Sequence, residues 1–254
     1  MSAQDESRRQ VRTIGLVGGM SWQSTALYYC LVNETMNEAL GGHHNARSVL
    51  VTVDFDDVLS PGMAGDWDAV AAILIDAVRD LERAGAECVV LTANTAHLVA
   101  DAVERATDLP LLHIADVAAD AIHAGGATKI GLLATRPTLE SGIYADRLRD
   151  RHGIEVTCPS AEERDRLHAI IVDELAHGAV RDEARSDCIA MIGRLTEGGA
   201  NGVLIACTEL PLLIGQDHSP VPVFDTTRLH AEAAVAFALD PSIASDAPAR
   251  TKSA

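Results

Sequence analysis

Aromatic residues are scarce in this chain of 254 residues: Phe, Trp and Tyr together make up 3% of it, whereas hydrophobic residues make up 48%. The core must therefore be built mainly from Leu, Val, Ile and Ala. Aliphatic side chains of this kind suit helices packed against buried parallel strands. The length is enough for one large domain or for two of ordinary size.

Basic residues are also few. Twenty Lys and Arg stand against 37 Asp and Glu, which gives a formal net charge of −17. So acidic a chain is a poor match for nucleic acid or an anionic membrane, because both carry negative charge themselves. The composition is still compatible with binding of a small anionic ligand, if positive side chains converge locally.

The chain lacks the patterns that would predict disulfides, a metal site or a membrane span. Its five cysteines are scattered, odd in number and form no CxxC pair. No spacing of His, Asp and Glu supports a metal, and no apolar run approaches the length of a bilayer. The first ten residues are polar. We therefore expect a reduced, soluble, cytoplasmic protein.

Short aliphatic runs alternate with helical patterns, which predicts an α/β fold with parallel sheets. The expected strands are 11–17, 47–54, 88–92, 110–113, 129–134, 154–157, 203–206 and 221–224. The expected helices are 22–39, 67–84, 95–105, 114–124, one ending near 149, 161–176, 181–197 and 225–239. We expect the tails 1–11 and 241–254 to be disordered.

Two segments of the chain recur in order. Residues 85–95 align with 199–209 at an offset of 114, and 14–16 align with 130–132 at an offset of 116. We interpret this as a duplicated α/β unit that gives two pseudo-symmetric domains with a cleft between them. The first would span 12–113 and be completed by the C-terminal helix 225–240, and the second would span 114–224.

Cys207 directly follows the aliphatic run 203–206, which places it at the carboxyl end of a strand, where ligands bind in open α/β sheets. Thr208 is expected to cap the next segment, whose backbone amides would then lower the pKa of the thiol. A buried structural cysteine is the alternative interpretation. The repeat places Ala93 opposite Cys207, so one wall of the cleft carries a thiol and the other a methyl group.

Several motifs in order resemble the aspartate/glutamate racemase family, the cofactor-independent amino-acid racemases. The motifs are Ile-Gly-Leu-Val-Gly-Gly-Met-Ser-Trp at 14–22, Asn-Thr-Ala-His at 94–97, Ala-Cys-Thr-Glu at 206–209 and Val-Phe-Asp-Thr at 223–226. The resemblance covers about residues 13–239. It implies an isomerase that acts on acidic amino acids in a cleft between two α/β domains, without pyridoxal phosphate or a metal. The ligand would be a small anionic amino acid or dicarboxylate, and a homodimer stays open.

The resemblance also assigns roles to individual residues. Cys207 would be an acid/base at the substrate α-carbon, and Ala93 occupies the position of the second acid/base, which is a cysteine or threonine in the family. The residues expected to bind substrate are Arg47, Asn94, Thr95, Thr135, Arg166 and Thr208. The residues alone leave simpler roles open for some of them, namely a helix cap for Asn94 and Thr95 and a helix-face ion pair for Arg166.

Three functions remain open at this point. The first is a racemase in which water or a hydroxyl such as that of Thr92 or Thr95 replaces the second base. The second is a single-cysteine decarboxylase of the arylmalonate type, in which one thiol protonates an enediolate after carbon dioxide leaves; Ala93 favours it. The third is an amino-acid-binding homologue with weakened catalysis.

Overall fold

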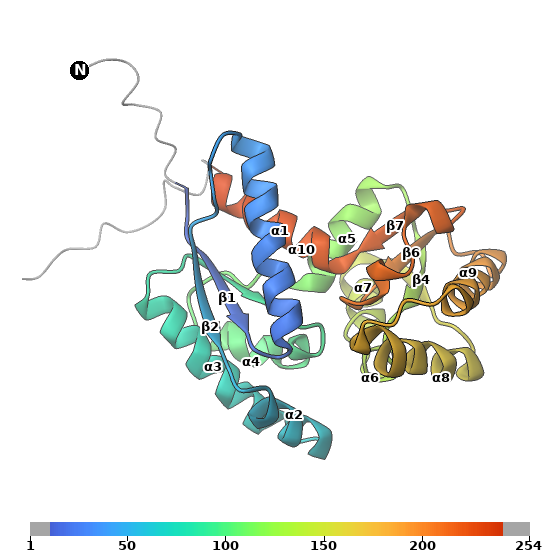
Figure 1. Cartoon of the computed structure of the whole chain (residues 1–254). Helices are drawn as coiled ribbons and strands as arrows, with labels where there is room; N and C mark the ends of the chain where they lie inside the picture. Colours follow the sequence, from blue (N-terminus) through green and yellow to red (C-terminus); the bar gives the residue numbers. More distant parts are fainter. Residues whose placement is uncertain (1–10, 241–254) are drawn as a thin grey trace, which may run out of the picture.

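The computed structural model describes residues 11–240, so the predicted disordered tails lie outside the described residues, apart from Val11. Two separate parallel sheets form its framework (Figure 1), with strand orders β2-β1-β3 and β5-β4-β6-β7. Their strands are β1 (Ile14–Gly18), β2 (Ser48–Thr52), β3 (Cys88–Leu91), β4 (Lys129–Leu133), β5 (Glu155–Thr157), β6 (Gly202–Ile205) and β7 (Val223–Asp225). The α/β prediction with two parallel sheets is confirmed. We call the parts built on the two sheets the first lobe and the second lobe.

Helices cover both faces of the central strands of the first lobe. Alternate residues of β1 and β3, such as Ile14 and Leu16, pack against α1 (Trp22–Leu40) and α10 (Thr226–Leu239). The residues between them, such as Val17, pack against α3 (Trp67–Arg83). This two-sided burial explains why these strands are aliphatic without polar alternation. The remaining elements of this lobe are α2 (Phe55–Ala64), η1 (Thr95–Val99) and α4 (Ala100–Arg105).

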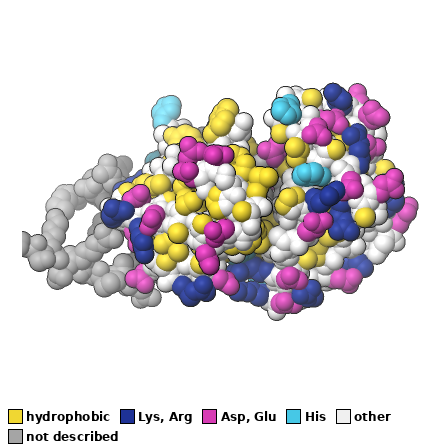
Figure 2. All heavy atoms as spheres, turned by 90° about the horizontal axis from the view of Figure 1, so that it is seen from below, with side chains coloured by type: hydrophobic (Ala, Val, Ile, Leu, Met, Phe, Trp, Pro, Cys, Tyr) yellow, Lys and Arg dark blue, Asp and Glu magenta, His cyan; other side chains and the backbone are white. Residues whose placement is uncertain are grey.

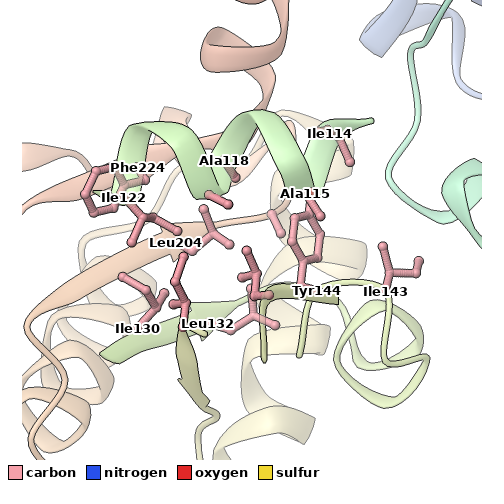
Figure 3. Close-up of a cluster of buried hydrophobic side chains, with 14 of the residues drawn as sticks. Ile114, Ala115, Ala118, Ile122, Ile130, Leu132, Ile143, Tyr144, Leu204 and Phe224 are labelled. Atoms are coloured by element: carbon pink, nitrogen blue, oxygen red, sulfur yellow. The ribbon is translucent and has the colours of Figure 1, made fainter. Parts of the chain in front are cut away.

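The second lobe follows the same plan. Ile122 and its neighbours on α5 (Ile114–Ala124) point onto Ile130, Leu132 and Leu204 of the sheet (Figure 3). The opposite face packs on α8 (Ala161–Ala169) and α9 (Asp182–Glu197). The other helical elements are α6 (Arg136–Glu140), α7 (Ala145–His152), η2 (Ile170–Glu174), η3 (Leu175–His177), η4 (Leu210–Leu212) and η5 (Gln216–His218).

The repeat predicted from the sequence is visible in the topology. β1 and β4 are equivalent central strands, and each pairs with the next two strands of its lobe. Ala93 and Cys207 each lie two residues beyond the end of the equivalent strands β3 and β6. The chain enters the second lobe with α5 and returns to the core of the first with α10. The exact domain boundaries stay a prediction.

Three predicted elements differ from the structure. The strand expected at 110–113 is reduced to a single bridge between Val89 and Leu111, because His113 already caps the next helix. The helix expected to end near 149 is interrupted at Gly142, whose φ of +74° favours glycine. α2 was not predicted at all. Among residues 11–240, no helix has the length and apolar character that crossing a membrane requires.

Three buried histidines lie where η1, the start of α5 and α10 meet. His97 packs on His113 and His230, with ring centroids 4.8 and 5.6 Å apart. His230 Nε2 lies 2.6 Å from the Leu112 carbonyl oxygen, which can only accept, so Nδ1 accepts from the Tyr28 hydroxyl at 2.9 Å. Burial, reinforced by neighbouring positive or titrating groups, lowers the pKa of each histidine to about 3.

This cluster predicts a steep loss of stability in mild acid. An unfolded chain binds these protons below about pH 6.5, whereas the folded chain binds them only near pH 3. Above pH 6.5 these histidines therefore do not change the free energy of unfolding. As the pH drops from 6.5 towards 3, the free energy of unfolding falls by up to roughly 1.4 kcal/mol per pH unit for each histidine. Carboxylates stay ionised between pH 6.5 and 5. In this range His97→Gln should reduce the slope of the unfolding free energy against pH, measured by urea titrations, by the equivalent of about one bound proton. The exposed His43→Gln should leave it unchanged, and equal slopes for both variants would contradict this account.

Candidate active site

Cys207 lies at the carboxyl end of β6, as predicted, but its thiol is almost completely enclosed. The residue is 5% exposed and packs in the core between β6, α8 and α9. Its Sγ donates a hydrogen bond to Glu209 Oε2 at 3.1 Å. A carboxylate acceptor beside the thiol means that the resting side chain is a neutral S–H group.

The environment raises the pKa of Cys207 well above the ordinary value for a thiol. Burial is the largest cause, and the Glu209 carboxylate is the second. The backbone amides of Glu209 and Leu210 do point at the sulfur and favour the thiolate, as expected, but they do not outweigh burial and the carboxylate. The prediction of a lowered pKa was wrong, because the sequence does not reveal where the Glu209 side chain lies.

Removal of the Glu209 charge is expected to make the thiol more acidic. The amide of Glu209→Gln is neutral and does not repel the thiolate as the carboxylate does. The pKa of Cys207 should therefore fall, and its thiolate should form at lower pH. The measurement is the rate of iodoacetamide alkylation of the Cys207 peptide against pH, followed by mass spectrometry. The exposed Cys30 provides the internal control in the same samples. An unchanged profile for Cys207 would show that the carboxylate does not govern the thiol.

Two hydrogen bonds join the lobes on either side of this position. The Thr208 hydroxyl, next to Cys207, lies 3.0 Å from the Ser24 hydroxyl in the first turn of α1. On the other side, the Tyr144 hydroxyl of the second lobe donates to Asn94 Oδ1, next to Ala93. The carboxyl ends of β3 and β6 therefore face each other across the junction. Figure 2 shows the two lobes from below, with a furrow between them.

Tyr144 also connects the two strand ends. It is fully buried, and burial raises the pKa of its hydroxyl well above the usual value, so it acts as a neutral donor. Thr226, whose side chain interacts with Tyr144, donates its hydroxyl to the Ile205 carbonyl oxygen at 3.0 Å. These contacts, from Asn94 through Tyr144 and Thr226 to Ile205, fix the segment that carries Ala93 relative to β6, the strand before Cys207.

The N-terminus of α1 lies beside the carboxyl end of β6, next to Thr208. Ser21 caps this helix, its side chain accepting from the Ser24 amide at 3.3 Å. It does so with φ of +117°, the only positive φ of a non-glycine residue within 11–240. Gly19 is required before it, since a Cβ there would lie 2.0 Å from the Val53 carbonyl oxygen. Strain of this kind often accompanies function, and here it places the helix end beside Thr208.

The Ala93 wall offers few groups that can exchange a proton. Thr92 is buried, donates to the Val17 carbonyl oxygen at 3.0 Å and lies 3.4 Å from the Thr25 hydroxyl, so it cannot replace the second base. Thr95 is exposed and begins η1. Neither Asn94 nor Thr95 caps a helix with its side chain, so the cap interpretation was wrong; Asn94 Oδ1 instead accepts from the Tyr144 hydroxyl.

The remaining predicted residues divide into two groups. Thr135 lies two residues beyond β4, at the same edge, with its hydroxyl 3.1 Å from that of Thr138. Thr208 is at this edge too, but it pairs with Ser24 and does not cap η4. The structure brings Cys207, Ala93, Asn94, Thr95, Thr135 and Thr208 to the facing strand ends.

The two predicted arginines lie elsewhere. Arg47 is exposed and precedes β2, so it lies at the amino end of the sheet, opposite to the edge that carries Ala93. Arg166 on α8 forms ion pairs with Asp187 at 2.8 Å and with Glu174 at 3.0 Å. Both carboxylates raise its pKa further, and they occupy its guanidinium. The ion-pair interpretation of Arg166 therefore fits the structure better than substrate binding.

Sequence reasoning missed two groups at this site. Ser24 is an ordinary residue in a helix, and Tyr144 sits in a loop between α6 and α7, so neither gives a local signal. The position of the Glu209 side chain, which accepts from Cys207, also has no signal in the sequence. Among the described residues, no group of three or more His, Cys, Asp or Glu side chains is arranged to hold a metal ion.

Comparisons with known proteins agree on one protein family. A family model described as Asp/Glu/Hydantoin racemase matches residues 17–234. The broad specificity amino-acid racemase RacX of Bacillus subtilis (strain 168) is 25% identical over 233 residues, which cover 87% of this chain and 96% of RacX. The crystal structure of a candidate Asp/Glu racemase from Yersinia pestis is 44% identical with a TM-score of 0.88, covering 90% of this chain and all of that one. An aspartate racemase homologue from Pyrococcus horikoshii OT3 is 33% identical with a TM-score of 0.83, covering 90% and 100%.

Proposed function

Because the chain belongs to the Asp/Glu/hydantoin racemase family, we propose that it is an amino-acid racemase whose acid/base group is the thiol of Cys207. The observation that carries this proposal is the position of the thiol two residues beyond β6, next to the Thr208–Ser24 bridge between the lobes. A bound substrate between these strand ends would meet donors from both lobes. The thiol is the one side chain of this group with suitable chemistry for proton transfer at carbon.

The proton must first leave the sulfur. Glu209 Oε2, 3.1 Å from Sγ, is the acceptor for it, and the amides of Glu209 and Leu210 stabilise the resulting thiolate. The thiolate then takes the α-hydrogen: the Cα–H bond breaks, an S–H bond forms, and the electron pair moves into the substrate carboxylate to give an enediolate. Hydrogen bonds from Asn94 and Thr208 would stabilise this charge, as donors placed at a developing negative charge do.

The opposite face lacks an equivalent group. Ala93 carries only a methyl group, and Thr92 is already committed to other partners. Water or the exposed Thr95 hydroxyl would then return the proton on this side, with a pKa poorly matched to the task. We therefore propose that removal and return of the proton on the Cys207 face are faster than inversion.

The preference for acidic amino acids also belongs to this proposal. Arg47 and Arg166 lie away from the facing strand ends. A basic residue that lies near these ends in the sequence is Arg136, the first residue of α6, which directly follows Thr135. It is half exposed and paired with Asp165 on α8. A side-chain carboxylate of the substrate would have to compete with Asp165 for this guanidinium.

The direct test is chiral chromatography of purified protein incubated with each enantiomer of aspartate, glutamate and a panel of neutral and basic amino acids. The proposal predicts slow interconversion, with the acidic amino acids converted best. Interconversion of neutral amino acids alone would reject the acidic preference and keep the enzyme class. A folded protein that binds an amino acid but converts none would support the weakened binding homologue.

One observation favours a decarboxylase as the second candidate. A neutral thiol with a raised pKa, facing a wall without a base, is suited to donate a proton to a carbanion and not to remove one. In that reaction a malonate derivative loses carbon dioxide, and the enediolate takes the proton of Cys207. Carbon dioxide release from an arylmalonate, with no conversion of amino acids, would select this candidate.

A further inference from the structure

The Tyr144 side chain is anchored in one lobe and makes its hydrogen bond to the other. It lies between α6 and α7, is fully buried, and packs in the core of the second lobe, where its ring points toward Ala115 of α5 (Figure 3). Its hydroxyl reaches across the junction and donates to Asn94 Oδ1 of the first lobe. Because a close-packed core holds the ring in one rotamer, the hydroxyl is a donor in a fixed position.

This hydrogen bond determines how the Asn94 amide is oriented. Burial raises the pKa of the Tyr144 hydroxyl well above its usual value, and the nearby Asp225 adds to the effect, so the hydroxyl keeps the proton that it donates. An asparagine amide is planar and carries its oxygen and its NH2 group on separate branches. With Oδ1 held by Tyr144, the two N–H donors of Nδ2 lie on the other branch.

The N–H donors of Asn94 are free to bind a ligand. Within residues 11–240, Nδ2 has no hydrogen-bond partner, and it is not one of the buried polar atoms that lack one, so it is accessible to solvent. Asn94 directly follows Ala93 beyond the carboxyl end of β3, which faces the carboxyl end of β6. The donors are thus available at the edge where the proposed substrate binds.

We propose that Tyr144 is a positioning residue: its hydroxyl holds the Asn94 amide so that Nδ2, and not Oδ1, faces the substrate carboxylate. This inference rests on the proposed function, because it concerns the enediolate that forms when the α-proton leaves. An amide turned the other way would place its oxygen against the carboxylate, and two acceptors repel each other. Since the two residues belong to different lobes, the donor is oriented only while the lobes are in contact.

The effect of this orientation is expected in kcat more than in KM. The electron pair of the broken Cα–H bond moves into the substrate carboxylate, so an oriented donor contributes most in the transition state. Removal of a whole donor of this kind lowers kcat by about 10²–10³-fold. Tyr144→Phe keeps the donor and frees its orientation, so kcat for α-deuterium exchange should fall by roughly 10- to 50-fold, with KM changed less than about threefold.

Tyr28→Phe is the matched control. Tyr28 is also buried in a core, and its hydroxyl also donates to a side chain, His230 Nδ1, at 2.9 Å. Both variants keep the ring and remove one buried hydrogen bond, so a loss of activity through weakened folding would occur in both. Tyr28→Phe should keep the wild-type kcat, and circular dichroism melting shows that both variants are folded. Equal losses of kcat in the two variants would overturn the proposal.

A double-mutant cycle tests whether Tyr144 acts through Asn94. In the Asn94→Ala protein, Tyr144→Phe should lower kcat no further, because there is no amide left to orient. Asn94→Asp keeps an acceptor for the Tyr144 hydroxyl but has no N–H group, so it should be as slow as Asn94→Ala. Additive losses in the double variant, or wild-type kcat in Asn94→Asp, would overturn the positioning role.

A readout that needs no turnover separates this inference from the proposed function. In protein labelled with ¹³C and ¹⁵N at asparagine, the Asn94 side-chain signals are those absent from Asn94→Ala. Tyr144→Phe should move the Asn94 Cγ resonance upfield, because its oxygen loses a hydrogen bond. A wild-type protein that exchanges no amino acid would reject the proposed function and this role with it. Wild-type exchange with an unmoved Asn94 resonance in Tyr144→Phe would reject the role of Tyr144 alone.

Discussion

Replacement of Cys207 by alanine is expected to reduce α-proton exchange of a bound amino acid by about 10³-fold or more. General acid–base groups typically contribute 10²–10⁴-fold, and the facing wall offers no second group of comparable strength. The reason is structural as well as chemical: with the sulfur gone, Glu209 has no thiol from which to take a proton. The measurement is the initial rate of deuterium uptake at Cα, by mass spectrometry, at equal protein concentration.

The matched control for this experiment is Cys188→Ala. Cys188 on α9 is fully buried in the same core cluster as Cys207, and burial raises the pKa of its thiol to about 12. Its replacement leaves a cavity of similar size and removes no group from the facing strand ends. Exchange should stay near the wild-type rate in this variant. Equal losses in the two variants would mean that core packing, and not the Cys207 thiol, is responsible.

Introduction of a cysteine at position 93 is expected to raise racemisation by about 10²-fold or more. Ala93 and Cys207 occupy equivalent positions beyond β3 and β6, so Ala93→Cys would place a second thiol on the facing wall. Two acid/base groups on opposite faces allow one to remove the α-proton while the other delivers one. Ala93 is half-buried, and its backbone carbonyl accepts from His97 Nδ1 at 3.1 Å, which a new side chain leaves intact.

Ala93→Val provides the comparison, because it fills the same space without an exchangeable proton. The ratio of inversion to α-deuterium exchange, measured by chiral chromatography and mass spectrometry on the same samples, should rise in Ala93→Cys and not in Ala93→Val. The double variant Ala93→Cys/Cys207→Ala should invert no faster than the wild-type protein. If Ala93→Cys exchanges normally but inverts no faster, the two positions do not face one substrate carbon.

The fold was predictable because its signals are local and repeated. The aliphatic runs at 14–18, 88–91 and 202–205 are buried on both faces, and the two matching segments keep the same place in both lobes. This was enough to identify Cys207 and Ala93 as equivalent strand ends. The strand at 110–113 failed because His113 starts α5 at once, a competition between strand and cap that the sequence alone does not decide.

The electrostatics of the site were not predictable in the same way. The amides expected near Cys207 are present, yet the pKa of the thiol rises, because burial and the Glu209 carboxylate depend on tertiary packing. Arg166 illustrates the same limit: its partners Glu174 and Asp187 lie 8 and 21 residues away. Arg47 was assigned to substrate binding by the family resemblance, although the predicted strand 47–54 already placed it at a strand start, which is the edge of the sheet opposite to Ala93.

The central claim is that one thiol exchanges protons with one face of a bound amino acid. Its most direct test is incubation of each enantiomer with the wild-type protein in deuterium oxide, with deuterium at Cα and configuration followed together. We expect one enantiomer to gain deuterium with retained configuration faster than it inverts. Absence of α-deuterium from every amino acid in the panel, with the protein folded, would contradict the claim.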